Sequence, residues 1–97
     1  MLYAMIAKDA PGALQRRLDT RPVHLEHLKS LGKKLIFAGA LLDADEQPEG
    51  SIVIFEADTL AEAEAMAAAD PFVPAGVFAS YEVKRWRIAI NNTSAEI

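Results

Sequence analysis

The chain has 97 residues, none of them cysteine, and its 10 Lys and Arg against 14 Asp and Glu give a net charge of −4 at pH 7. An acidic protein lacks the positive field that attracts nucleic acids and anionic lipids, so we expect neither as a partner. The absence of cysteine excludes disulfides, thiolate metal sites and cysteine nucleophiles, and no apolar run reaches the length of a membrane span. We therefore expect a cytoplasmic protein with one compact domain.

The first half of the chain predicts a strand, a long helix and a second strand. "LYAMIA" at 2–7 is a short apolar run that the turn-forming "KDAPG" closes. From Pro11 onward, leucines recur at helical spacing and predict an amphipathic helix that Gly32 ends. Pro22 lacks an N–H donor, so we expect the helix to kink or restart near Thr20 or Arg21. "KLIFAGALL" at 34–42 is the second strand.

The second half predicts a strand, a helix and a strand. The polar link "DADEQPEG" leads to "SIVIFEA", which we expect to pair with the preceding strand as a hairpin. Thr59 and Glu62 have the spacing of a capping box, and the helix "TLAEAEAMAAA" should end near Asp70. "VFASYEVKRWRIAI" alternates apolar and polar residues and forms the fourth strand, followed by the polar "NNTSAEI".

This order, β-α-β-β-α-β, predicts an α+β, ferredoxin-like fold, with an antiparallel sheet and both helices on one face. Residues 1–90 then form one domain and residues 91–97 a polar C-terminal tail. Several strand residues are apolar on both faces, among them Ile6 and Ile52. We expect the face without helices to be covered by a second copy, which makes the protein a homodimer through sheet-to-sheet packing.

The two histidines, His24 and His27, lie three residues apart in "RPVHLEHL". Neighbouring positions on one helical flank could hold a metal ion, but the nearby acids supply no third ligand, so we expect no metal. His27 reads as a solvated surface residue. His24 lies at the edge of the buried stripe, where it is either a structural residue bonded to a carbonyl or a residue with chemistry.

Asp70, in "DPFVPAG", is a carboxylate among apolar residues at the end of the second predicted helix. One reading is an Asx-turn residue before Pro71 that ends the helix. The other reading pairs it with His24, since the two helices lie side by side in this fold. A carboxylate that accepts a hydrogen bond from an imidazole fixes its tautomer and raises its basicity, which suits a general acid–base residue.

The motifs "RPVHLEHL", "GSIVI" and "DPFVPAGV", in this order, resemble those of the YciI-like family within the dimeric α+β barrel superfamily. The resemblance covers about residues 2 to 88. It implies ferredoxin-like protomers that dimerise through their sheets, and a pocket with a histidine and an aspartate as acid–base residues, which by motif are His24 and Asp70. The predicted substrate-binding residues are Arg17, Arg21, Ser51 and Phe72.

The resemblance to a dehydrochlorinase of chlorinated-aromatic breakdown, and to muconolactone isomerases of the wider superfamily, implies elimination or isomerisation of a small ring or dienoic acid. We therefore expect a lyase or isomerase that needs no cofactor, with His24 and Asp70 as the acid–base pair and an arginine anchoring a substrate carboxylate. The alternatives are a module that binds a small ligand without transforming it, and a structural domain that only dimerises. The glycines form no phosphate-binding loop, so nucleotide binding is not expected.

Overall fold

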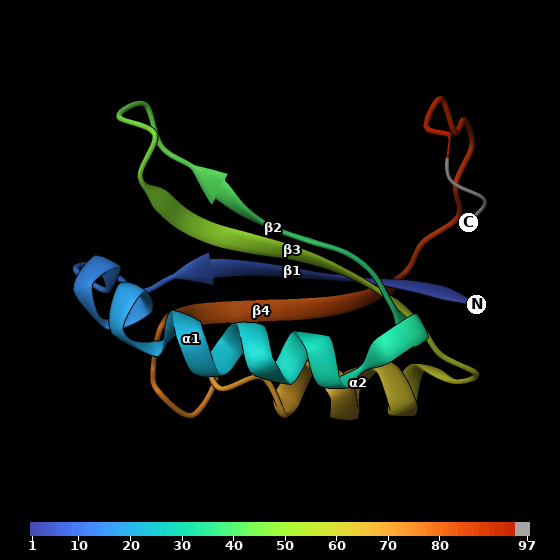
Figure 1. The fold of residues 1–97 in the computed structure, drawn as a ribbon, viewed down its shortest axis with the longest axis horizontal. Coiled ribbons are helices and arrows are strands. Elements are labelled where there is room, and N and C mark those ends of the chain that lie inside the picture. Colours follow the sequence, from blue (N-terminus) through green and yellow to red (C-terminus); the bar gives the residue numbers. More distant parts are fainter. Residues whose placement is uncertain (95–97) are drawn as a thin grey trace.

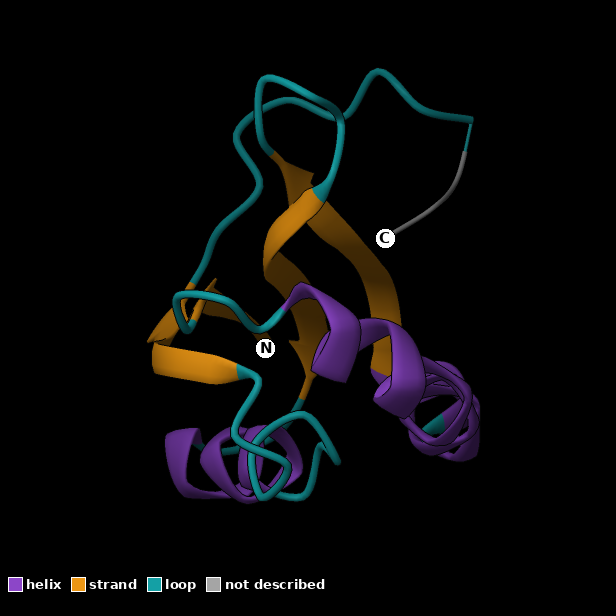
Figure 2. Ribbon diagram, turned by 90° about the vertical axis from the view of Figure 1, so that its left-hand side faces the viewer, coloured by secondary structure: helices purple, strands orange, loops and turns teal. Residues whose placement is uncertain are grey.

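The structure is a computed structural model that describes residues 1–94. Its elements are β1 (Leu2–Asp9), α1 (Leu14–Ser30), the short 3-10 helix η1 (Gly32–Lys34), β2 (Leu35–Leu42), β3 (Pro48–Glu56), α2 (Leu60–Ala68) and β4 (Phe78–Arg85). The four strands form one antiparallel sheet in the order β2-β3-β1-β4, and both helices lie on the same side of it (Figures 1 and 2). The predicted α+β, ferredoxin-like fold is confirmed.

Helix α1 runs from Leu14 to Ser30 without the break that we predicted near Thr20 and Arg21. Pro22 lies inside it, where its missing N–H leaves the carbonyl of Leu18 without an intrahelical partner. Both residues are exposed, so water can hydrate that carbonyl. The contacts that the buried side of the helix makes on either side of Pro22 outweigh the local preference of proline to end a helix.

Local signals set the ends of both helices. Gly32 follows the C-terminus of α1 with φ of 58°, a left-handed conformation that glycine adopts without a steric penalty. At the start of α2, the Thr59 side chain accepts a hydrogen bond of 3.1 Å from the Glu62 N–H. The Glu62 carboxylate in turn accepts from the Asp58 N–H at 3.3 Å. In the usual capping box it would accept from the N–H of the cap residue, Thr59, so the reciprocal bond here reaches one residue further back along the chain.

The core lies between the sheet and the helices. Met5 of β1 is paired with Val53 of the neighbouring strand β3, and both side chains are buried together with Leu28 of α1 and Ala67 of α2. Because side chains alternate along a strand, the residues next to Met5 and Val53 point to the opposite face. This register therefore directs every second residue of β1 and β3 toward the helices, where the candidate site lies.

The sheet face without helices is partly apolar. The register places Ile6 opposite Ile52, and Ile52 opposite Gly39 of β2, so all three share this face with Phe37 and Leu41. Ile6, Phe37, Leu41 and Ile52 are exposed, each by 39% or more. We call these four side chains the apolar sheet patch.

The last strand is shorter than we predicted, because β4 ends at Arg85 and residues 86–94 contain no helix or strand. This segment rises on the side of the sheet away from the helices (Figure 1). The final three residues of the predicted polar tail, 95–97, lie outside the described residues. Within residues 1–94, no helix is long and apolar enough to cross a membrane.

Candidate functional site

The segment from Asp70 to Gly76 folds into a series of tight turns after α2. The Phe72 N–H donates to the Asp70 carboxylate at 2.9 Å, which is the Asx turn that one reading of the sequence predicts. Backbone hydrogen bonds from Val73 to Asp70 and from Val77 to Phe72 close the following turns. Asp70 and Phe72 are therefore held rigidly, and both are at least 98% buried.

Asp70 also contacts His24 of α1. The Nδ1 of His24 lies 2.8 Å from Oδ1 and 3.0 Å from Oδ2 of Asp70. An ionised carboxylate only accepts hydrogen bonds, so Nδ1 carries the proton that is donated, and in the neutral ring Nε2 keeps a lone pair. Asp70 is therefore both a turn residue and the hydrogen-bond partner of His24.

The second ring nitrogen of His24 is open. Within residues 1–94, the only buried side-chain nitrogen or oxygen without a hydrogen-bond partner is Nε2 of His27. Nε2 of His24 makes no hydrogen bond in this part of the chain, so it reaches accessible space. His24 lines a small cavity between α1 and β2, and Nε2 is the nitrogen available to a molecule bound there.

Phe72 orients the imidazole. Its ring stacks on that of His24, with the centroids 3.9 Å apart and the planes 11° from parallel. The guanidinium carbon of Arg17 lies over the same ring, 4.7 Å from its centroid. Arg17 and His24 are seven residues apart on α1, about two helical turns, so Phe72 fits between them.

Arg17 is a buried cation with four hydrogen bonds to protein groups. Nε and Nη2 donate to the two carboxylate oxygens of Asp9 at 2.7 and 3.2 Å, and Nη2 also donates to the Gly50 carbonyl at 2.7 Å and to Ser51 Oγ at 2.6 Å. The side chains of Arg17 and Asp9 are only 5% and 7% exposed. This buried ion pair joins the end of β1, the first turn of α1 and the middle of β3.

Gly50 is needed for this arrangement. A Cβ atom on Gly50 would lie 2.5 Å from the backbone oxygen of Ala7, a distance that side chains do not adopt. Glycine therefore lets β3 approach β1 closely, and the Gly50 carbonyl and Ser51 hydroxyl come within reach of Arg17. The predicted "GS" motif has two separate structural roles in the site.

The cavity has a volume of about 140 Å³. Of the predicted site residues, the structure brings His24, Arg17, Arg21 and Ser51 to its wall, while Asp70 and Phe72 support His24 from behind. Arg21 is exposed, and none of its nitrogens has a protein partner in residues 1–94, whereas two nitrogens of Arg17 are occupied. The remaining wall is apolar or small, and consists of Leu25, Leu28, Ala38, Gly39, Ala40 and Val53.

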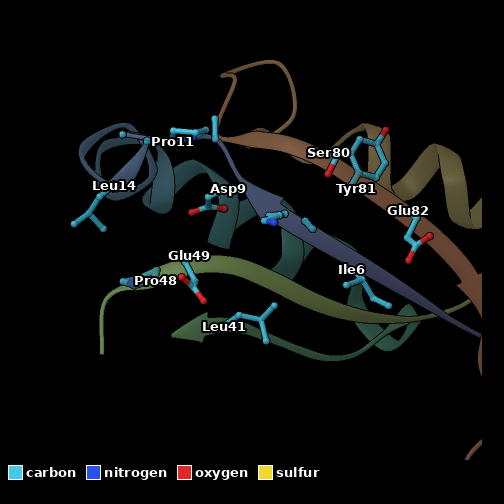
Figure 3. A pocket seen from close by; sticks show the side chains of 15 residues that line it. Ile6, Asp9, Pro11, Leu14, Leu41, Pro48, Glu49, Ser80, Tyr81 and Glu82 are labelled. Carbon is cyan, nitrogen blue, oxygen red and sulfur yellow. The ribbon is translucent and has the colours of Figure 1, made fainter. Parts of the chain in front are cut away.

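A larger hollow of about 930 Å³ lies elsewhere, at the end of β1 and on the side of the apolar sheet patch (Figure 3). Ile6 and Leu41 point into it together with Glu49 and Glu82 (Figure 3). It shares only Asp9 with the network of Arg17 and contains neither His24 nor Asp70. Its size reflects an open sheet face, so we assign the chemistry to the smaller cavity.

His27 differs from the sequence interpretation of a solvated residue. It is half-buried, and its Nε2 is covered and has no hydrogen-bond partner. The reason is its position three residues after His24, on the same flank of α1. In residues 1–94, no group of three or more His, Asp or Glu side chains is arranged to hold a metal ion.

Asp9 is the residue of this site that the sequence interpretation missed, because "KDAPG" reads as a turn. The available signal was an acid at the end of a buried strand, with arginines one helical turn into the next element. The sequence does not identify which arginine pairs with it, since both Arg16 and Arg17 follow. The structure assigns Arg17 to Asp9, while Arg16 donates to the Gly76 carbonyl at 3.1 Å.

Comparison with known proteins agrees with the resemblance. The YCII-related domain family matches residues 1–87. Protein YciI of Escherichia coli O6:H1 is 38% identical over 95 residues, which cover 90% of this chain and 97% of that protein. An uncharacterised protein of Haemophilus influenzae is 40% identical over 96 residues, with the same shares of the two chains.

Among solved structures, the chain is similar to 5-chloro-2-hydroxyhydroquinone dehydrochlorinase (TftG) from Burkholderia phenoliruptrix AC1100, in complex with 2,5-dihydroxybenzoquinone. The identity is 38%, the TM-score is 0.83, and the match covers 90% of this chain and 94% of that one. An antibiotic biosynthesis monooxygenase, at 16% identity and a TM-score of 0.59, shares the fold alone. The chain therefore belongs to the family of YCII-related domain proteins.

Proposed function

We propose that the protein is a lyase or isomerase that acts on a small oxygenated ring or dienoic acid, with His24 as the general base and acid. The observation that carries this proposal is the hydrogen bond from His24 Nδ1 to Asp70, in a side chain that lines the cavity and whose Nε2 has no hydrogen-bond partner in residues 1–94. A histidine that a buried carboxylate orients in this way is a common acid–base catalyst.

The cavity supports a substrate of ring size. Its volume of about 140 Å³ is close to the roughly 150 Å³ of an engineered cavity that binds benzene. Its wall is mostly apolar with a few polar groups, as is typical of small-molecule sites. The likeness to TftG, which was solved with a dihydroxybenzoquinone, favours a ring that carries oxygen substituents.

The reaction begins at a carbon next to a carbonyl group. Nε2 of His24 takes the proton, and the electron pair of the C–H bond forms a double bond while the carbonyl electrons move to the oxygen. In an isomerisation, the imidazolium returns the proton at another carbon. In an elimination, a substituent leaves with its bonding electrons as the carbonyl re-forms. Arg21, exposed at the cavity, anchors a substrate carboxylate when one is present.

The test is a screen of chlorinated hydroquinones, hydroxyquinones and unsaturated lactones in D₂O, with mass spectrometry to detect chloride loss, isomerisation or deuterium uptake. The parent should transform at least one compound, and His24→Ala should lose this activity while its circular dichroism spectrum is unchanged. Turnover that survives in His24→Ala would remove His24 from the mechanism. Saturable binding without any product would favour a ligand-binding module instead.

We also propose that the protein is a homodimer through the apolar sheet patch. Ile6, Phe37, Leu41 and Ile52 are each exposed by 39% or more on one sheet face, an arrangement that association with a second copy would cover. Sedimentation velocity should give a dimer for the parent and a monomer for Ile52→Glu. Leu60→Glu, at an equally exposed leucine of α2, is the control and should remain dimeric. A monomeric parent at micromolar concentration would contradict this proposal.

A further inference from the structure

Ser51 lies at the cavity with its hydroxyl proton uncommitted. Arg17 Nη2 and Ser51 Oγ are 2.6 Å apart, and a guanidinium can only donate, so Ser51 accepts in this bond. Ser51 makes no other side-chain hydrogen bond in residues 1–94, although it is 2% exposed. Ser51 lines the cavity, and its one side-chain hydrogen bond uses Oγ as the acceptor, so its O–H is free to donate to a molecule bound there.

Arg17 adds positive charge behind this donor. Its Nη1 makes no hydrogen bond in the described chain and is not among the buried unpartnered atoms, so this nitrogen reaches accessible space. The buried Asp9 carboxylate fixes the other side of the guanidinium. A hydroxyl that accepts from a cation is polarised toward donating, as cooperative hydrogen bonding strengthens each member of a chain.

Two hydrogen-bonded chains thus end at one cavity with opposite roles. The first chain runs from Asp70 to His24 and ends at the lone pair of Nε2, which accepts a proton. The second runs from Asp9 through Arg17 and ends at the hydroxyl of Ser51, which donates a hydrogen bond. Arg17 and His24 are separated by two turns of α1, about 10.5 Å of helix rise, and Phe72 holds both. Phe72 therefore contacts both of the α1 residues from which these chains reach the cavity.

We propose that Ser51 is the oxyanion donor of the reaction and that Arg17 is its positioning residue. When His24 removes a proton from the substrate carbon, the electron pair reaches the carbonyl oxygen, and the Ser51 hydroxyl, with the charge of Arg17 behind it, stabilises the enolate that forms. This assignment rests on the proposed function and narrows its ligand to molecules whose ring oxygen carries negative charge.

The test uses 2,5-dihydroxybenzoquinone, whose ionised oxygens resemble an enolate, as the probe. Isothermal titration should show binding to the parent, and Ser51→Ala should raise Kd by about 10- to 100-fold, as expected for the loss of a hydrogen bond to a charged group. Ser80→Ala, at a serine of β4 that lines the larger hollow and not this cavity, is the matched control and should keep the parent Kd.

A ¹⁵N NMR spectrum of His24 in each variant shows whether Ser51 donates a hydrogen bond to the probe or only supports the structure of the site. In Ser51→Ala the imidazole should keep the proton on Nδ1, because the contact with Asp70 does not involve Ser51. The assignment is overturned if Ser51→Ala binds the probe as the parent does, if it loses the His24 tautomer, or if the parent does not bind the probe. None of these results decides the role of His24, which depends on turnover in His24→Ala.

Discussion

The imidazole of His24 lies nearly parallel to the ring of Phe72, with their centroids 3.9 Å apart, and the guanidinium of Arg17 also lies over this ring, 4.7 Å from its centroid. Phe72 is fully buried and makes a further edge contact with Phe78 at 5.6 Å. The phenyl ring therefore cannot turn without displacing its neighbours. His24 is held by this packing as well as by its hydrogen bond to Asp70.

Replacement of Phe72 by leucine should lower the free energy of unfolding by about 1 to 2 kcal/mol, since the volume is nearly kept and the stacking contacts are lost. Chemical denaturation of the purified protein measures this. Phe37→Leu changes an exposed ring of the apolar sheet patch and should have a smaller effect on the protomer. Equal stabilities for the parent and Phe72→Leu would show that the stack contributes little.

Gly50→Ala should destabilise the protein by about 1–3 kcal/mol, because the new Cβ would clash with the Ala7 carbonyl and force β1 and β3 apart. Gly39→Ala is the matched control: Gly39 is also in a strand, a Cβ there meets nothing within 4 Å, and its stability should change little. Thermal unfolding of both variants compares them. A Gly50→Ala protein as stable as Gly39→Ala would contradict the close approach of the two strands.

Thr59→Ala should cost about 1 kcal/mol of unfolding free energy, since it leaves the Glu62 N–H at the start of α2 without its side-chain acceptor. Urea unfolding measures the change. Glu64→Ala lies on the exposed surface of the same helix and makes no capping bond, so its stability should stay near that of the parent. A larger loss in Glu64→Ala than in Thr59→Ala would refute the capping role.

An exposed ion pair joins the segment after α1 to α2. The hydrogen bond with Glu62 raises the pKa of Lys34, and the same bond with Lys34 lowers the pKa of Glu62. The Glu62 contribution to stability is therefore present above its unfolded pKa of 4.5 and is lost as the pH falls through the folded value. The Lys34 contribution is present below 10.5 and is lost as the pH rises through its own folded value.

Lys34→Ala should move the pKa of Glu62 upward, because the variant removes the largest cause of its lowering. A carboxyl titration followed by NMR measures this in the parent and the variant. Lys33→Ala, at the preceding lysine, is the control and should leave the titration of Glu62 unchanged. An identical Glu62 titration in the parent and Lys34→Ala would mean that the pair does not form in solution.

The elements that the sequence predicted correctly depend on local signals. The Thr59 cap, the Gly32 terminus and the apolar runs of the strands each act within a few residues. The approach of His24 and Asp70, 46 residues apart, followed from topology, because two helices on one sheet face must be neighbours.

Other features could not be predicted because they depend on packing between distant elements. Pro22 stays within a helix because tertiary contacts outweigh local preference. Asp9 pairs with Arg17 and not Arg16 because of how α1 is turned toward the end of β1, which no pattern in the chain specifies. The stack of Phe72 between two residues of α1 has the same origin.

The most direct test of the acid–base site is the tautomer of the neutral His24 ring, read from long-range ¹H–¹⁵N correlations. We expect a proton on Nδ1 and an unprotonated Nε2 in the parent, because Nδ1 donates to the Asp70 carboxylate. In Asp70→Ala the proton should move largely to Nε2, and in His27→Ala it should stay on Nδ1. A protonated Nε2 in the parent, or a tautomer that Asp70→Ala does not change, would contradict the pairing of His24 with Asp70.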